Sequence, residues 1–482
     1  MGKSIVKNYI YNNILLIFNL AYPLITTIYI NKIFSVNLIG EVSFSLSIVT
    51  IFISLSSLGI TSYGTREIAK NRNSNENMSK IFSELLFLNF ISVIFFLLLY
   101  FSVISFFSSF HQYSKIFMIL SLNLFMSVFS LEWFYIGLEE YEYITKRSIL
   151  TKIISFMFMI VFIKSEKDIY LYVVFLVLGI SLNGIFNLYN SRKFVRISFE
   201  KLELKKYIKL LKYFYFQTVM GCLYNGTDQV ILGLNSTKDQ VAYYTRSRQL
   251  ISVMVAISLS FVNTITPRLN NKIENKDEYK KLVNFSFDFT CFLSFPFLVG
   301  TLLLSKNLLY IIGKDKFLPA ANILRVLTGL LIFTLGAVFL NTNISIPHNK
   351  EKNTFYGNVG VMVISLVVSL ILSEKYGGIG SAIAIILGEF VGVVVQLFFI
   401  KKQNLYLGFF SKNTMKYLAS ALVMGGVILS IKLQNLGCVK EFIFSCILGG
   451  IIYIITLFLL KEELIKKILI RISIKAKKEK YK

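Results

Sequence analysis

The sequence predicts an all-α integral membrane protein with about 14 transmembrane helices. Hydrophobic residues make up 55% of the 482 positions and charged residues only 16%, whereas soluble domains carry about 25% charged residues. Long stretches such as 42–65 and 85–114 contain no Asp, Glu, Lys or Arg, and about 20 predominantly apolar residues suffice to cross a bilayer. This composition excludes a disordered, collagen-like or disulfide-rich chain.

Each predicted span is an apolar stretch that ends at charged or polar residues. In chain order the spans are 9–30, 37–60, 82–107, 116–137, 148–164, 168–190, 213–234, 247–266, 283–305, 319–342, 354–373, 380–400, 416–432 and 442–460. The first follows Lys3 and Lys7 as a signal peptide would, but no small-residue cleavage site comes after it. We therefore expect an uncleaved first span.

The distribution of basic residues predicts the orientation. If the loops alternate from a cytoplasmic N-terminus, 36 of the 51 Lys and Arg residues lie in inner segments and 13 in outer segments, with Lys152 and Arg325 inside spans. Cytoplasmic loops of membrane proteins are enriched in Lys and Arg in this way. We therefore expect both termini to face the cytoplasm. The richness in Lys, Ile and Asn indicates an AT-rich bacterial genome, so the expected location is the cell membrane of a bacterium.

Two six-helix lobes around a central cavity, followed by two more helices, form the predicted architecture. Residues 39–66 align without gaps on residues 241–268, which indicates an internal repeat, and paired lobes are a common transporter plan. The predicted domains are 1–200, 201–403 and 404–482. The basic stretch 191–212 suits an interfacial helix between the lobes, and the basic tail 461–482 suits attraction to anionic lipid headgroups.

Several function classes are disfavoured by what the sequence lacks. The two histidines and four cysteines show no metal-ligand spacing, and no phosphate-binding loop for ATP occurs. No loop is long enough to fold a catalytic domain. The net charge of +25 follows from the inner loops, so nucleic acid is not the expected partner. The sequence predicts a transporter with no cofactor and no metal, not an enzyme.

Ionisable residues inside predicted spans are the candidate functional residues, because charge in a bilayer is costly and usually faces a partner or a wet cavity. Arg246, Arg248 and Arg325 are candidates to bind a phosphate-bearing substrate, since Arg offers two parallel donors. Asp228 and Glu389 are candidates for ion coupling. In a second interpretation Asp228 pairs with Arg246 or Arg248, and Arg325 reaches the outer interface. Both interpretations stay open at this stage.

Four motifs resemble those of Wzx-type polysaccharide flippases of the MOP exporter superfamily. Residues 62–70 read SYGTREIAK, and residues 132–139 read EWFYIGLE, followed by Tyr143-Ile144-Thr145 and Arg147. Residues 227–233 read TDQVILG, and residues 376–380 read YGGIG. The first two are fairly specific for the family, whereas the last two occur across the superfamily.

The resemblance implies an exporter that moves an undecaprenyl-pyrophosphate-linked oligosaccharide to the outer leaflet for capsule or O-antigen synthesis. It also implies membrane lipids, a polysaccharide polymerase and other assembly proteins as partners. Because the sequence has no nucleotide site, an uphill cycle would need a gradient of a coupling ion, H⁺ or Na⁺. Cavity cations engage the pyrophosphate in that family, and we assign this role to Arg246, Arg248 and Arg325. Arg66 lies in the first motif and is our candidate for an inner gate; its alternative role is that of a basic anchor.

Alternative functions remain open from the sequence. A flippase for the peptidoglycan precursor lipid II would have to solve the same physical problem for a substrate with a different glycan. An ion-coupled multidrug antiporter of the same superfamily would prefer an acidic cavity, against which the arginines weigh. A membrane scaffold for a synthesis complex is the third alternative.

Overall fold

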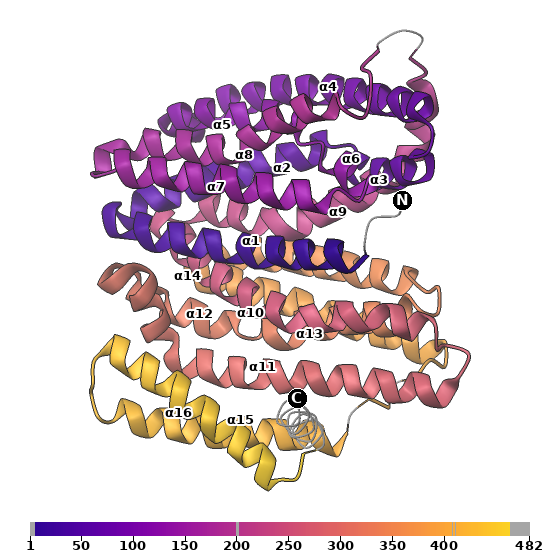
Figure 1. The fold of residues 1–482 in the computed structure, drawn as a ribbon. Coiled ribbons are helices and arrows are strands. Elements are labelled where there is room, and N and C mark those ends of the chain that lie inside the picture. Colours follow the sequence, from indigo (N-terminus) through magenta and orange to yellow (C-terminus); the bar gives the residue numbers. More distant parts are fainter. Residues whose placement is uncertain (1–4, 199–201, 407, 410, 463–482) are drawn as a thin grey trace, which may run out of the picture. The chain divides into compact units, whose positions relative to one another are not determined.

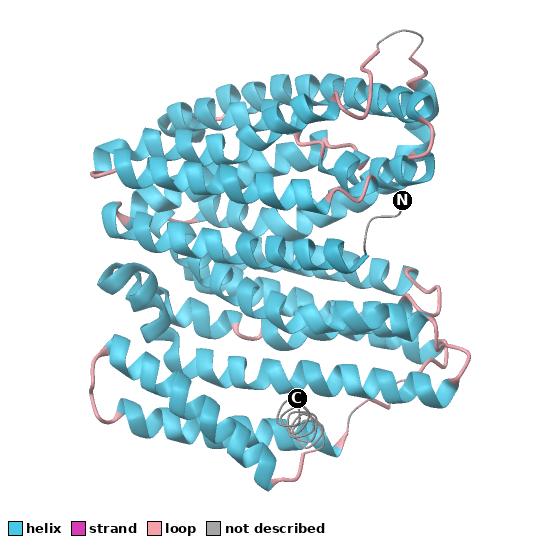
Figure 2. Cartoon of the chain, viewed as in Figure 1, coloured by secondary structure: helices cyan, strands magenta, loops and turns pink. Residues whose placement is uncertain are grey.

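A computed structural model describes residues 5–198, 202–406, 408–409 and 411–462. Within these ranges the regular structure is helical and contains no strand (Figure 2). A helix satisfies its backbone hydrogen bonds within one segment, which a chain surrounded by hydrocarbon requires. The predicted class, an all-helical membrane protein, is confirmed.

Ten helical segments of the described residues are long and apolar enough to cross a membrane, and Leu330–Ser345 is a shorter apolar segment. Every predicted span overlaps a helix of the structure. The number of 14 crossings stays a prediction. The tail from residue 463 onward lies outside the described residues.

The chain divides into two compact units, Met1–Ala242 and Tyr243–Lys482. The predicted boundary lies earlier, at residue 200. The difference arises because α9 (Lys205–Asn235), expected to open the second lobe, contacts α2 (Val36–Ser56) and α3 (Ile60–Asn71). The predicted domain limits stay a prediction about the lobes that act in transport.

The first unit contains nine α-helices and three short 3₁₀ segments among its described residues (Figure 1). Besides α2, α3 and α9 these are α1 (Ile5–Ile33), α4 (Asn75–Phe106), η1 (Ser108–Tyr113), α5 (Ser114–Met126), η2 (Ser127–Phe129), α6 (Glu132–Gly137), α7 (Tyr141–Phe162), η3 (Glu166–Asp168) and α8 (Ile169–Ser191). Helix α7 packs on α1 and α8, and α2 packs on α4, α5 and α9.

The second unit begins within α10 (Lys238–Asn270). It continues through α11 (Lys276–Gly313), η4 (Lys314–Ala320), α12 (Ala321–Leu327), α13 (Leu330–Phe339), η5 (Leu340–Ser345), α14 (Lys352–Lys402), α15 (Lys412–Lys432) and α16 (Cys438–Leu459). Helices α15 and α16 pack on each other and on α11.

Two predicted spans are broken in the structure. Span 116–137 consists of α5, η2 and α6, and the chain turns at Leu131, which has a left-handed backbone (φ 46°) and a fully buried side chain. This conformation costs roughly 1–2 kcal/mol for a residue with a Cβ. Span 319–342 is divided into α12, α13 and the π-helical η5. Short interruptions of this kind leave little trace in an apolar sequence.

The expected interfacial helix in 191–212 is wrong for the described residues. From Lys205 the chain already belongs to α9, which continues to Asn235 without a break. The start of α9 is tied to the buried carboxylate of Glu84 on α4, which accepts hydrogen bonds from Tyr207 Oη (2.7 Å) and Glu203 N (3.0 Å). A hydrogen bond from Lys80 keeps the pKa of the neighbouring Glu203 carboxyl below its ordinary value. These bonds hold the segment against α4.

Helix α14 is a hairpin of two helical arms that reverses at Gly377, within the predicted turn 377–380. Gly377 has φ 55° and ψ −134°, a conformation that residues with a Cβ rarely adopt. The arms face each other through reciprocal hydrogen bonds between Asn353 and Gln403, each 3.0 Å. A Cβ on Gly380 would lie 2.1 Å from the carbonyl oxygen of Leu372. The turn predicted between the two spans is confirmed.

The substitution Gly380→Ala should therefore destabilise the protein. The added methyl meets backbone atoms that cannot rotate away, so we expect a loss of about 1–3 kcal/mol. Thermal unfolding in detergent measures it. Gly426→Ala in α15, where an added Cβ meets nothing within 4 Å, is the matched control and should leave the midpoint unchanged or higher. Equal midpoints for the two variants would contradict the hairpin geometry.

Candidate functional site

Arg246 and Arg248 lie in α10, both half-buried. Arg246 Nη1 donates to Gln249 Oε1 (3.3 Å), and Arg248 Nη1 donates to the hydroxyl of the buried Tyr244 (3.5 Å). Residues two apart on a helix point about 200° away from each other. The two guanidinium groups therefore leave the helix on different faces.

Arg325 lies in α12, immediately before the break at residues 328–329. Its side chain is half-buried, and Nη1 donates to Oδ1 of the exposed Asn322 (2.9 Å). Thr328 Oγ1 donates to the carbonyl oxygen of Arg325 (2.5 Å) and supports the backbone at the end of the helix. The three predicted cations thus all belong to the second unit.

The two carboxylates proposed for ion coupling are both buried in helical segments. Asp228 in α9 is 6% exposed, and its Oδ1 accepts a hydrogen bond from Gln229 N (2.8 Å). Glu389 in the second arm of α14 is 2% exposed and accepts a hydrogen bond from Thr334 Oγ1 (2.8 Å) on α13. Asp228 belongs to the first unit and Glu389 to the second.

Arg66 in α3 lies over aromatic rings. Its guanidinium carbon is 5.1 Å from the ring centre of Phe214 and 5.4 Å from that of Tyr63, and Nε pairs with Glu67 Oε1 at 3.2 Å. Tyr63 in turn packs edge-on against Tyr207 and Phe214. Arg66 therefore contributes to the contact between α3 and α9.

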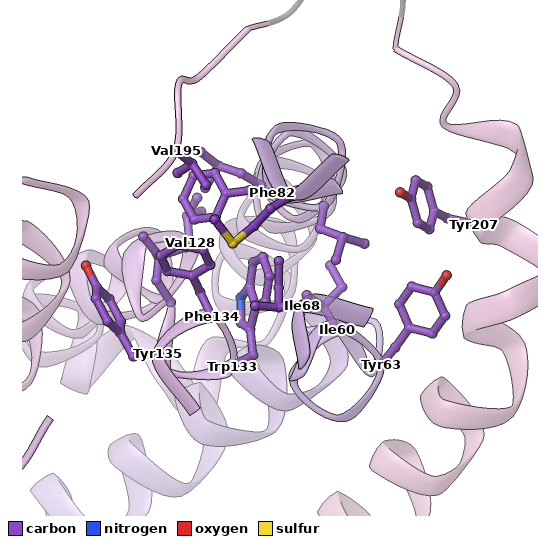
Figure 3. Close-up of a cluster of buried hydrophobic side chains, with 14 of the residues drawn as sticks. Ile60, Tyr63, Ile68, Phe82, Val128, Trp133, Phe134, Tyr135, Val195 and Tyr207 are labelled. Carbon is purple, nitrogen blue, oxygen red and sulfur yellow. The ribbon is translucent and has the colours of Figure 1, made fainter. Parts of the chain in front are cut away.

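The two family-like segments 62–70 and 132–147 pack directly on each other. A Cβ on Gly64 would lie 2.5 Å from the ring of Trp133, so only glycine allows the indole this close to α3. Thr65 Oγ1 donates to the carbonyl oxygen of Trp133 (3.2 Å). Figure 3 shows Trp133 and Phe134 beside Phe82 in the buried cluster that joins α3, α4 and α6. The motifs thus belong to one structural feature.

Arg147 is a buried ionisable residue that the sequence reasoning named within a motif but gave no role. It is 5% exposed and lies in α7. Its Nη1 donates to Asn187 Oδ1 on α8, and its Nη2 pairs with Glu132 Oε1 at 3.3 Å. The side-chain amide of Asn187 also donates to the backbone carbonyl oxygen of Ser130. The backbone carbonyl oxygen of Asn187 accepts a hydrogen bond from Tyr135 Oη (2.6 Å). The EWF…R motif was the available signal, because it contains both Glu132 and Arg147.

The helical fold and the apolar spans together define a multi-pass membrane protein, within which several ionisable side chains are buried. The chain belongs to the polysaccharide biosynthesis protein family, whose profile matches residues 5–271, more than half of the chain. Relatives with which it shares sequence are described as flippases and transporters.

Two relatives illustrate the kinship. A putative O-antigen transporter of Shigella dysenteriae is 24% identical over 401 residues, which cover 81% of this chain and 98% of that protein. A probable low-salt glycan biosynthesis flippase, Agl15 of Haloferax volcanii, is 22% identical over 251 residues, 50% of this chain and 52% of that protein. The match to the archaeal relative thus spans about half of its length.

Solved structures share the fold. The lipid II flippase MurJ in an inward closed conformation superposes with a TM-score of 0.78 at 16% identity, over 95% of this chain and 100% of that chain. An outward-facing MATE multidrug transporter superposes with a TM-score of 0.55 at 13% identity, over 83% of this chain and 93% of that chain. At these identities the likeness concerns the fold alone.

Replacement of Arg147 by methionine should destabilise the first unit. It leaves Asn187 Oδ1 buried without its donor, so we expect the free energy of unfolding to fall by about 2–4 kcal/mol. Arg72→Met is the matched control, because Arg72 pairs with Glu139 at 2.9 Å with side chains 48% and 41% exposed. The control should cost less than about 1 kcal/mol. Thermal unfolding of both variants in detergent measures the two losses of stability. Equal losses would contradict the expectation that the buried arginine matters more than the exposed one.

Proposed function

We propose that the protein flips undecaprenyl-pyrophosphate-linked oligosaccharide repeat units across the cytoplasmic membrane of a bacterium. The observation that carries this proposal is the family match together with the match to 98% of the length of the Shigella O-antigen transporter. The oligosaccharide then serves synthesis of a capsule or O-antigen-type polysaccharide. Both termini face the cytoplasm in this proposal, as the distribution of Lys and Arg favours.

The pyrophosphate is the part of the substrate that most needs protein partners. Moving a charged group into a low-dielectric environment without partners is prohibitively costly. Arg246, Arg248 and Arg325 supply positive charge in or beside the membrane-spanning helices of the second unit, and Arg donates to phosphate through two parallel bonds. Because Arg246 and Arg248 point to different faces of α10, they serve the headgroup at different places or in different states of the cycle.

Transport proceeds by alternating access, with an inward-facing and an outward-facing state. Arg66 and its aromatic contacts on α9 belong to an inner gate. Asp228 and Glu389 couple the cycle to H⁺ or Na⁺, because a buried carboxylate changes its net charge when it binds either ion. Lipids surround the protein, and a polysaccharide polymerase and other assembly proteins are its partners in the pathway.

A lipid II flippase is the second candidate, which a sequence match to the lipid II flippase MurJ of Thermosipho africanus favours (25% identity over 234 residues, 47% of this chain and 46% of that protein). The two functions share the lipid and the pyrophosphate and differ in the glycan. Expression in cells depleted of their lipid II flippase separates the candidates: survival supports lipid II transport, whereas restored surface polysaccharide in a flippase deletion supports the proposed function.

Simultaneous replacement of Arg246, Arg248 and Arg325 by glutamine should reduce surface polysaccharide at least about tenfold, because each charge-assisted hydrogen bond to phosphate contributes roughly a factor of ten. The measurement is complementation of a flippase deletion at equal protein level. The control replaces three exposed cations of the same unit, Lys306, Lys314 and Lys316, and should complement fully. Full complementation by the arginine variant would remove these residues from the proposed site.

Glu389→Gln should reduce the rate of gradient-driven transport at least about tenfold, while the protein stays folded. The amide keeps an oxygen that accepts the hydrogen bond of Thr334 but cannot take up a proton. Transport into proteoliposomes, with and without a pH or sodium gradient, measures the effect. Glu374→Gln, an exposed carboxylate on the first arm of the same hairpin, is the control. Gradient-driven transport at the wild-type rate would exclude Glu389 from coupling.

A further inference from the structure

The first unit contains a cavity of about 340 Å³ that has no assigned function. Its size lies in the range of small-molecule sites, about 300–1,000 Å³. Side chains of α2, α3, α4, α5, α6 and α8 line it. Among the lining residues Thr61, Ser130, Glu132 and Ile180 are exposed, whereas Asn89, Asn123 and Ser181 are buried. The cavity therefore reaches the surface of the unit, and we call the buried Asn89, Asn123 and Ser181 its polar floor.

The floor carries polar atoms without a hydrogen-bond partner. Asn89 is 8% exposed and Ser181 is 6% exposed, and neither Asn89 Oδ1 nor Ser181 Oγ has a partner among the described residues. Buried polar groups normally do have one. Leaving such a group unpaired costs roughly as much as losing a hydrogen bond. Asn89 and Ser181 therefore bring unused hydrogen-bonding capacity to the lining of this cavity.

The charge of the cavity determines which kind of occupant fits. Glu132 is the one ionisable residue that lines it, and its carboxylate is already paired with Arg147 at 3.3 Å. A bound phosphate would find no cation in the lining to balance its negative charge. A bound metal ion would find no carboxylate that is free of another partner. Each would remain an uncompensated charge, which is costly in a buried site. A neutral ligand avoids this cost.

The hydrogen-bonding groups of the lining match hydroxyl groups. An asparagine amide offers both donors and an acceptor, and a serine or threonine hydroxyl offers one donor and two lone pairs. Asn183 is held in place, since it donates to the carbonyl oxygen of Gly179 (3.1 Å) and accepts from Thr151 (2.9 Å). A lining of amides and hydroxyls suits a ligand that presents several hydroxyls, each able to donate and accept.

We propose that this cavity binds a neutral sugar residue of the transported glycan. The proposal rests on the proposed function and adds a glycan subsite to it, apart from the arginines assigned to the pyrophosphate. In this subsite Asn89 and Ser181 bond to sugar hydroxyls from the floor, and Thr61 and Glu132 border the entrance. The Glu132–Arg147 pair keeps the site electrically neutral.

The test compares two probes on the full-length protein by native mass spectrometry. One probe is the lipid-linked oligosaccharide extracted from cells that make the polysaccharide, and the other is undecaprenyl pyrophosphate, which has no sugar. The double variant N89L/S181A should bind the oligosaccharide about tenfold more weakly, the equivalent of one or two hydrogen bonds. Its affinity for undecaprenyl pyrophosphate should stay within about twofold of the wild-type value, since the sugar-free lipid lacks the group that these atoms bind.

The variant should fold, because it replaces polar atoms that have no partner in the protein with apolar groups of similar size, which is neutral or stabilising. Ser92→Ala is the matched control. Ser92 lies in α4 like Asn89, is 8% exposed and has an unpartnered Oγ, but it does not line the cavity. It should bind both probes as the wild type does. If N89L/S181A does not fold, N123A carries the same expectation from another wall of the cavity.

The outcomes separate the subsite from the proposed function. Unchanged oligosaccharide affinity in N89L/S181A, with tight binding by the wild type, overturns the subsite, leaves the flippase proposal intact and means that the cavity holds only water. Stabilisation of the wild type but not of the variant by Na⁺ overturns it in favour of a cation site. If the wild type binds neither probe, the proposed function fails and the subsite with it.

Discussion

The absence of water in the hydrocarbon core constrains this protein more than any single contact does. Backbone groups there must bond within their own segment, which makes every described regular element a helix. Polar side chains must likewise find partners among themselves. Arg147 meets Glu132 and Asn187, and in the second unit Asp288 accepts from Ser411 Oγ at 2.7 Å. Each such pair fixes two segments that apolar packing alone would leave free to slide.

In the first unit these polar contacts lie where the helices are interrupted. The break between α5 and α6 places Glu132 and Trp133 at the start of a new helix, and Leu131 takes up the strained backbone. Trp133 is then held by Gly64, and Glu132 by Arg147. Because an unbroken helix would carry these side chains elsewhere, the interruption forms one wall of the polar cavity. Strain in the backbone persists only when its surroundings hold it in place, and here they do.

The sequence predicted the positions of the helices well, because a long apolar stretch has few alternatives in a membrane protein. It also predicted the turn at Gly377, where glycines follow one another closely. It missed the breaks within 116–137 and 319–342. Glu132 directly follows the first break and Arg325 lies just before the second, but a single charged residue in an apolar stretch does not by itself predict an interruption of the helix.

The candidate site was harder to predict because partners lie far apart along the chain. Asn187 and Arg147 are 40 residues apart, and their contact depends on how α7 and α8 pack. Likewise nothing in the pattern of residues distinguishes Asn89 from the many other amides in the spans. An unsatisfied atom is defined by its surroundings, and these exist only in the folded chain. Periodicity and composition describe each segment by itself.

The two proposed sites would divide recognition of the substrate according to its chemistry. Lipid-linked glycans share a pyrophosphate, so cations that bind it add affinity for all of them and discriminate little. Discrimination between similar ligands requires buried polar groups that a wrong ligand leaves unpaired. A neutral cavity with fixed amides meets this requirement, because a sugar with a displaced hydroxyl would leave Asn89 or Ser181 unsatisfied. Selectivity for the glycan should therefore arise in the uncharged cavity and not at the arginines, although the arginines are the residues that the sequence indicates first.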